Sequence, residues 1–135
     1  MVSVRSVAWI DASGAEVWAL VRDSERLPEW VSGVASCRVD GDRRVCVLST
    51  GAELEERVVT LDDELRRLEY EVLAGLPADE HRGTVDVIED GAERCLVVYS
   101  TWVEPARLAR GLQRSTDGAV AGLVSVFVTN QSVGW

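Results

Sequence analysis

The sequence has no lysine and only one histidine among its 135 residues. Without lysine it cannot form a Walker-type phosphate loop, and it contains no glycine-rich phosphate loop of another kind. One histidine and three scattered cysteines make a poor ligand set for zinc. The Gly-x-Ser-x-Gly elbow of serine hydrolases is also absent. We therefore expect neither a metal ion nor a cofactor.

Positive charge is scarce as well, because 14 arginines stand against 23 acidic residues and the net charge is −9. Such an acidic surface repels a phosphate backbone, so nucleic acid is not an expected partner. The N-terminus enters a strand pattern at once, without the charged and apolar regions of a signal peptide. Cytoplasmic localisation is the resulting expectation.

The sequence also has no apolar run long enough for a membrane span. Residues 118–135 carry no charge, but polar residues interrupt them, namely Ser125, Thr129, Asn130, Gln131 and Ser132. A span needs about 20 mostly apolar residues. We expect a helix that is buried against the sheet or covered by a second subunit, which leaves a homodimer open. Its valines form helix weakly, so the helix is expected to fray or change structure there.

The three cysteines, Cys37, Cys46 and Cys95, match no metal motif, and an odd number argues against a disulfide framework. If Gly41 and Asp42 form a two-residue hairpin tip, Cys37 and Cys46 lie opposite each other. A bridge between them is then geometrically conceivable, but buried, reduced thiols are favoured in a cytoplasm.

The length predicts one domain, residues 1–135. Residues 2–11 form the first predicted strand, and Ser13 with Glu16 makes a capping box for a helix. A second short helix is expected around residues 29–31. Alternation with a period of two then predicts six strands, over residues 35–40, 44–50, 53–61, 68–75, 80–89 and 94–103. The short turns between them make neighbouring strands antiparallel.

From Pro105 onward the spacing predicts a long helix with Leu108, Leu112, Ala119 and Leu123 on one side. The expected fold is thus α+β, with a curved antiparallel sheet of about seven strands wrapped around the C-terminal helix. A gap between a curved sheet and a single helix is a candidate pocket.

Three polar residues occupy apolar faces of successive predicted strands. Glu56 shares its side of the strand with Leu54 and Val58, Tyr70 with Leu68 and Val72, and His81 with Gly83 and the valines of its strand. In the next strand either Tyr99 and Thr101 or Trp102 points inward, and Tyr99 is favoured. This pattern predicts a cavity lined by Glu56, Tyr70 and His81.

Burial would raise the pKa of Glu56 and keep His81 neutral, whereas an ion pair between them would titrate as one unit. Either arrangement suits general acid–base catalysis, with the Tyr70 hydroxyl as donor to a carbonyl oxygen. The alternatives are a satisfied core histidine, a carboxylate held by a tyrosine or arginine, and a core tyrosine.

Further candidates line the predicted cavity. Gly83 would let a ligand approach the backbone, and Trp30 would either close one mouth or seat the short helix on the sheet. The candidate ligand-binding residues are Trp30, Val58, Val72, Gly83, Tyr99 and Leu112.

Several segments resemble the polyketide cyclase/dehydrase family of the START-like, birch-pollen-allergen-like superfamily, which has the helix-grip fold. They are Ile10-Asp11-Ala12-Ser13, Glu16-Val17-Trp18, Arg26-Leu27-Pro28-Glu29-Trp30, Glu56-Arg57-Val58, Tyr70-Glu71-Val72, Arg82-Gly83-Thr84-Val85 and Glu104-Pro105. An aromatic residue is common in the family where His81 stands. Superfamily members include cyclases, lyases, lipid carriers and hormone receptors, so fold does not settle activity.

Two functions follow from this resemblance and these residues. The first is a cyclase or dehydratase that acts on a hydrophobic, carbonyl-rich, polyketide-like substrate by exchange of protons between Glu56 and His81. The second is non-catalytic binding, transport or sensing of a hydrophobic small molecule. An acid beside a base favours the enzyme, because a carrier of apolar ligands needs neither.

Overall fold

The fold is built on one antiparallel sheet. A computed structural model describes residues 2–132 and the side chains of residues 2–128. The seven strands are β1 (Val2–Ile10), β2 (Val34–Asp40), β3 (Arg43–Leu48), β4 (Glu53–Asp62), β5 (Arg67–Ala74), β6 (Glu80–Glu89) and β7 (Cys95–Glu104). They agree with the strands predicted from alternation to within two residues at each end.

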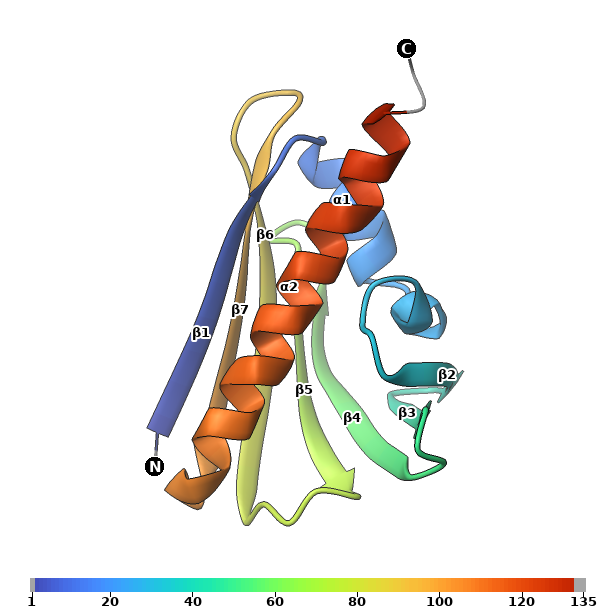
Figure 1. Ribbon diagram of the computed structural model, residues 1–135, viewed down its shortest axis with the longest axis vertical. Coiled ribbons are helices and arrows are strands. Elements are labelled where there is room, and N and C mark those ends of the chain that lie inside the picture. The colour runs from blue at the N-terminus through green and yellow to red at the C-terminus, as the bar shows by residue number, and fades with distance from the viewer. Residues whose placement is uncertain (1, 133–135) are drawn as a thin grey trace.

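The strand order is β1-β7-β6-β5-β4-β3-β2, and every pair is antiparallel. Strands β2 to β7 follow one another as hairpins, so each short turn places the next strand beside the last. β1 closes the other edge by pairing with β7 along its whole length, from Val2 opposite Val103 to Ile10 opposite Cys95. The strands curve around a concave face (Figure 1).

Two short helices follow β1. Helix α1 (Gly14–Val21) is capped by Ser13, whose hydroxyl accepts the backbone N–H of Glu16 at 3.1 Å, as the capping box predicts. The 3-10 helix η1 spans Ser24–Glu29, whereas we expected a short helix around residues 29–31. Pro28 lies inside this helix, near its end, and has no backbone N–H to donate.

The C-terminal helix α2 (Ala109–Ser132) follows a short 3-10 helix η2 (Ala106–Leu108) and crosses the concave face of the sheet (Figure 1). It packs on β1 and β7, with a buried side formed by Thr116, Ala119, Val120, Leu123 and Phe127. The Ser6 hydroxyl donates to the Asp117 carboxylate at 2.5 Å and shares a hydrogen bond with the Thr116 hydroxyl at 2.7 Å, and these bonds attach the helix to β1.

The expected fraying at the valines does not occur, because α2 continues unbroken to Ser132. Val124 and Val126 pack against the core cluster, and burial of an apolar face outweighs their weak helix propensity. The last part of the uncharged stretch, residues 133–135, lies outside the described residues. Within residues 2–132, no helix is both long and apolar enough to cross a membrane.

Candidate functional site

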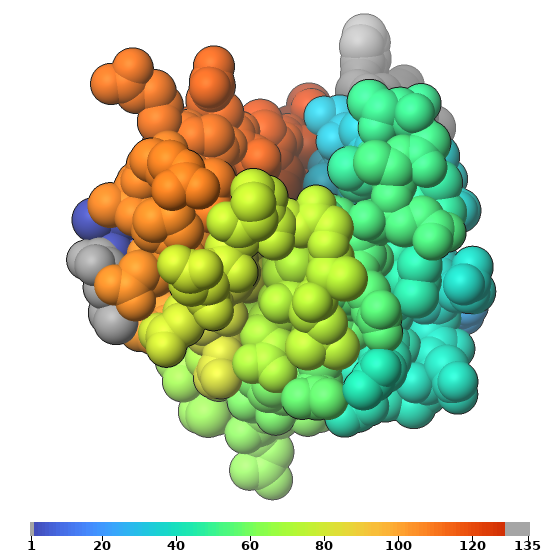
Figure 2. All heavy atoms as spheres, turned by 90° about the horizontal axis from the view of Figure 1, so that it is seen from below, coloured from blue at the N-terminus to red at the C-terminus, as the bar shows by residue number. Residues whose placement is uncertain are grey.

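A cavity of about 640 Å³ lies between the concave face of the sheet and helix α2. Its lining includes residues 31–34, 48–50 and 75–76 and, on α2, residues between Leu112 and Ala119. Figure 2 views the molecule from this end and shows a hollow between the first half of α2 and these loops. The predicted trio of Glu56, Tyr70 and His81 lines this cavity together.

Glu56 forms a buried ion pair with Arg44. The two residues are directly opposite on β4 and β3, and the Arg44 Nε donates to the Glu56 carboxylate at 2.7 Å. Both side chains are almost fully buried, with 4% and 7% exposed. Arg44 also donates to the Ser24 hydroxyl on η1 at 2.9 Å. Burial raises the pKa of Glu56, and the Arg44 charge limits this rise.

Arg44 is the site residue that we missed in the sequence. Alternation along β3 puts Arg44 on the same side as Cys46 and Leu48, so the signal that identified Glu56 was present here too. Two adjacent arginines are also typical of a solvent-exposed segment, and this interpretation concealed the inward direction of Arg44. Arg43 instead meets Glu55 in an exposed pair at 3.0 Å.

Tyr70 and Tyr99 join their hydroxyls in a hydrogen bond from β5 and β7. Burial raises the pKa of Tyr70 well above its usual value and that of Tyr99 to about 12, so both are neutral phenols. The Arg44 guanidinium carbon lies 4.6 Å from the centroid of the Tyr70 ring, a distance typical of a cation–π contact. One wall of the cavity therefore carries a connected group of polar side chains.

His81 points inward beside this group. Its ring lies 5.4 Å from that of Tyr70, centroid to centroid, and the residue is 8% exposed. Burial, with a smaller effect of the Arg82 charge, lowers the pKa of His81 to about 4, so the imidazole is neutral near pH 7. Its buried Nδ1 has no hydrogen-bond partner among the described residues.

No hydrogen bond joins Glu56 to His81 within the part of the chain that the structure describes. Glu56 is held by Arg44, whereas the ring contact of His81 is with Tyr70. The two groups expected to exchange protons thus line one cavity without a hydrogen bond between them. A proton would need an intervening group to pass from one to the other.

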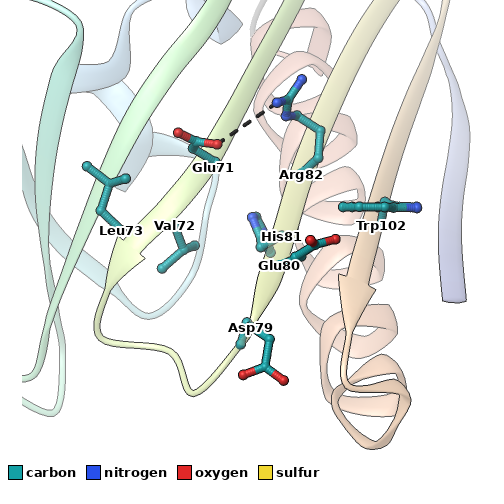
Figure 3. Close-up of a pocket in the computed structure, with 9 residues that line it drawn as sticks. Glu71, Val72, Leu73, Asp79, Glu80, His81, Arg82 and Trp102 are labelled. Atoms are coloured by element: carbon teal, nitrogen blue, oxygen red, sulfur yellow. Dashed lines mark ion pairs between the residues drawn. The ribbon is translucent and has the colours of Figure 1, made fainter. Parts of the chain in front are cut away.

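A second opening lies beside His81, where the sheet splits. The β5–β6 ladder runs only from Arg67 opposite Asp86 to Tyr70 opposite Gly83, although β5 stays paired with β4 and β6 with β7 beyond that point. The split forms a groove of about 710 Å³ (Figure 3). Glu71 and Arg82 face each other across it at 3.9 Å. His81 and Val72 line both the groove and the internal cavity.

The remaining candidates divide into two groups. Val72, Tyr99 and Leu112 line the cavity. Trp30, Val58 and Gly83 lie outside the described lining. Trp30 is buried behind Tyr99, with ring centroids 6.5 Å apart. At Gly83 the space that we expected a ligand to use is filled, because a Cβ there would lie 2.4 Å from the Tyr70 ring.

Comparison with known proteins agrees with this architecture. The sequence matches the profile of the family described as "Polyketide cyclase / dehydrase and lipid transport" over residues 1–129, and the chain belongs to this family. No curated protein matches the sequence.

Three solved structures illustrate the shared fold. The XoxI protein of Bacillus cereus is 20% identical, with a TM-score of 0.90 over 97% of this chain and 99% of that chain. A START superfamily protein of Mycobacterium smegmatis is 12% identical, with a TM-score of 0.82 over 94% and 97%. Norcoclaurine synthase of Thalictrum flavum, in complex with dopamine and hydroxybenzaldehyde, is 18% identical, with a TM-score of 0.73 over 99% and 88%. At these identities the likeness shows the fold alone. The helix-grip fold expected from the sequence is thereby confirmed.

Three kinds of functional group line this cavity. They are a neutral imidazole, a pair of phenols, and a guanidinium fixed by a carboxylate. Among the described residues, no group of three or more His, Cys, Asp or Glu is placed to bind a metal ion. The arrangement is suited to moving a proton and to stabilising an oxygen that gains negative charge.

Proposed function

We propose that this protein binds a hydrophobic, carbonyl-rich small molecule in the internal cavity and converts it by general acid–base catalysis, as a small cyclase or dehydratase. The observation that carries the proposal is the environment of His81. Its Nδ1 is buried without a partner among the described residues, and its ring packs against Tyr70, which is bonded to Tyr99. A base and a hydrogen-bond donor therefore lie side by side in an apolar cavity.

In the proposed reaction His81 accepts the proton of a C–H next to a substrate carbonyl. The electrons of that bond move to the carbonyl, and the hydroxyl of Tyr70 or Tyr99 donates to the enolate oxygen. The enolate carbon then attacks a second carbonyl of the same molecule, which closes a ring, and the imidazolium gives its proton to the oxygen of that carbonyl. In a dehydration His81 removes a second proton beside the first carbonyl, and the imidazolium passes it to the new hydroxyl, which leaves as water.

Arg44 and Glu56 act in this proposal through the tyrosines. The guanidinium, 4.6 Å from the Tyr70 ring centroid, places positive charge beside the donor. Glu56 fixes that guanidinium through its 2.7 Å hydrogen bond and is thus a positioning residue. This assignment differs from the proton exchange with His81 that we expected from the sequence.

The size of the cavity and the family support a small-molecule substrate. A volume of about 640 Å³ falls within the usual range for ligand pockets, roughly 300–1,000 Å³. The family description includes cyclases and dehydrases as well as lipid transport. The related fold of norcoclaurine synthase accommodates dopamine and hydroxybenzaldehyde, two small molecules that each contain an aromatic ring.

A second candidate is binding and transport of an apolar molecule without turnover. This candidate is favoured because Arg44 is hydrogen-bonded to Glu56 and Tyr70 to Tyr99, so the members of each pair are hydrogen-bond partners of each other. A wall of mutually satisfied polar groups can orient a ligand and need not react with it.

The two candidates are distinguished with 2-acetonaphthone, an apolar aromatic ketone with exchangeable protons beside its carbonyl. A thermal shift measures binding, and proton NMR in D₂O measures exchange of the methyl protons. We expect the protein to accelerate exchange, and His81→Ala to bind the ketone with exchange slowed by about 100-fold or more. Glu80→Ala, which changes the exposed preceding residue, is the matched control and should leave exchange unchanged.

Binding of the ketone without faster exchange in the unaltered protein would favour the carrier. Exchange that survives unchanged in His81→Ala would remove His81 from the mechanism. If neither this ketone nor a panel of fatty acids and aromatic ketones raised the melting temperature, both functions would lose their support.

A further inference from the structure

Cys37 and Cys46 face each other in the wall of the cavity. They are directly opposite on β2 and β3, and their sulfur atoms lie 2.8 Å apart as free thiols. Both residues are buried, and Cys46 lines the cavity two residues from Arg44. The function proposed above makes no use of either thiol.

The register places this pair where the backbone suits a cross-strand bond. The β2–β3 hairpin has a two-residue turn at Gly41-Asp42, flanked by Asp40 opposite Arg43. The pair that flanks such a turn is hydrogen-bonded, and opposite pairs then alternate between hydrogen-bonded and non-hydrogen-bonded positions. The ladder has no bulge between this turn and the cysteines. Cys37 and Cys46 are three pairs from Asp40 and Arg43 and therefore form a non-hydrogen-bonded pair.

Non-hydrogen-bonded pairs bring the two Cα atoms closest, to about 4.5 Å. This distance lies within the roughly 4.4–6.8 Å that a disulfide spans. Because the thiols already touch, closing a bond between them requires only small side-chain adjustments. The third cysteine, Cys95 on β7, is fully buried and has no thiol partner in the described part of the chain.

We propose that Cys37 and Cys46 are a redox-active pair that hydrogen peroxide converts to an intramolecular disulfide in the wall of the ligand cavity. Peroxide is small enough to enter the cavity that Cys46 lines, and the Cys37 sulfur lies only 2.8 Å from the Cys46 sulfur. This inference rests on the β2–β3 hairpin and is independent of the function proposed for the cavity.

The two thiols have different roles in this reaction. The hydrogen bond from Cys46 lowers the pKa of Cys37, and the same contact raises the pKa of Cys46. The Cys37 thiolate attacks one peroxide oxygen, the O–O bond breaks, and the hydroxide released takes up the proton that Cys37 lost. The Cys46 sulfur then attacks the resulting sulfenic acid, and its own proton leaves with the hydroxyl as water. Two thiols and one peroxide thus give one disulfide and two waters.

The test treats the full chain with hydrogen peroxide or with dithiothreitol, followed by unfolding, alkylation with iodoacetamide and intact mass spectrometry. We expect peroxide to remove two hydrogens and to reduce the alkylated thiols from three to one, with dithiothreitol restoring all three. Cys95→Ala should still form the bridge. Cys37→Ser and Cys46→Ser should not, and circular dichroism checks that each variant is folded.

The bridge should appear in the monomer on non-reducing gels, and a tryptic digest should link the segments that contain residues 37 and 46. If peroxide instead added oxygen to single cysteines, or joined two chains, the proposal would be overturned. It would also be overturned if Cys95 reacted as readily as the pair, because proximity would then not govern the reaction.

Discussion

Gly83 and Tyr70 are directly opposite on β6 and β5, and the tyrosine ring fills the space that a side chain at position 83 would need. A Cβ at residue 83 would lie 2.4 Å from Cζ of Tyr70 and 2.8 Å from its hydroxyl oxygen. The absence of a side chain thus lets the ring pack against β6, with its hydroxyl bonded to that of Tyr99 and its centroid 5.4 Å from that of the His81 ring.

Gly83→Ala should therefore displace Tyr70 and break its hydrogen bond to Tyr99. Added volume at a packed position typically costs about 1–3 kcal/mol of unfolding free energy. Urea denaturation measures this loss, and near-ultraviolet circular dichroism reports on the tyrosines. Gly111→Ala, at a helical position with no atom within 4 Å of the added Cβ, is the control. It should stabilise the protein by about 0.5–1 kcal/mol. Equal effects at the two sites would refute the packing role of Gly83.

The neighbouring arginines 43 and 44 offer a comparison of an exposed and a buried ion pair. Arg44→Met leaves the Glu56 carboxylate buried without its cation, so we expect a loss of about 3–5 kcal/mol of unfolding free energy. Arg43→Met removes only the exposed contact with Glu55 and should change stability by less than about 1 kcal/mol. Chemical denaturation of both variants at one pH makes the comparison.

The double variant Arg44→Met/Glu56→Met should regain most of the stability lost in Arg44→Met, because no unpaired charge remains buried. The pH dependence provides a second check. The pKa of Glu56 is raised by folding, so its contribution to stability is lost as the pH rises above 4.5 through the folded value. Without Arg44 the pKa of Glu56 rises further, so the free energy of unfolding should decline more steeply as the pH rises. A double variant as unstable as Arg44→Met would argue against this account.

The inner face of the sheet could be predicted because strand alternation is a local property. It placed Glu56, Tyr70 and His81 together, and the structure brings all three to one cavity. Alternation cannot say which polar groups pair across strands. The bond of Glu56 to Arg44 and that of Tyr70 to Tyr99 depend on register and on the curvature of the sheet.

The features that could not be predicted arise from contacts distant in sequence. The lack of a side chain at Gly83 suggests room for a ligand, but the ring of Tyr70 on the neighbouring strand β5 fills this space. The valines near the end of α2 have weak intrinsic helix propensity, yet packing on the core keeps the helix intact. The split between β5 and β6 leaves no mark in either strand's alternation, since each strand remains paired on its other side.

Helix α2 packs tightly against the segment after η1 at Gly122. A Cβ there would lie 1.9 Å from the Trp30 carbonyl oxygen, so Gly122→Ala must shift either the helix or the segment after η1. We expect a loss of about 1–3 kcal/mol in unfolding free energy. Gly118→Ala, one turn earlier with no atom within 4 Å of the new Cβ, should instead stabilise the helix by about 0.5–1 kcal/mol. Thermal denaturation of the two variants distinguishes close packing from propensity, because propensity alone would stabilise both.

The single histidine gives a direct measure of the electrostatics of the cavity. Burial lowers the pKa of His81 from 6.5 to about 4 in the folded protein. Between these values the unfolded chain binds the proton more tightly than the folded one, so stability is fully present above pH 6.5 and is lost as the pH falls toward 4. The loss amounts to about 3 kcal/mol at full extent.

His81→Asn cannot titrate, so subtraction of its stability profile from that of the unaltered protein should isolate this loss from the effects of the carboxylates. The Cε1 proton of the sole imidazole should show the same low midpoint by NMR titration. A midpoint near 6.5, or identical pH profiles for the two proteins, would mean that His81 is solvated in solution. His81 would then not be the buried, unpartnered imidazole on which its role in the proposed function rests.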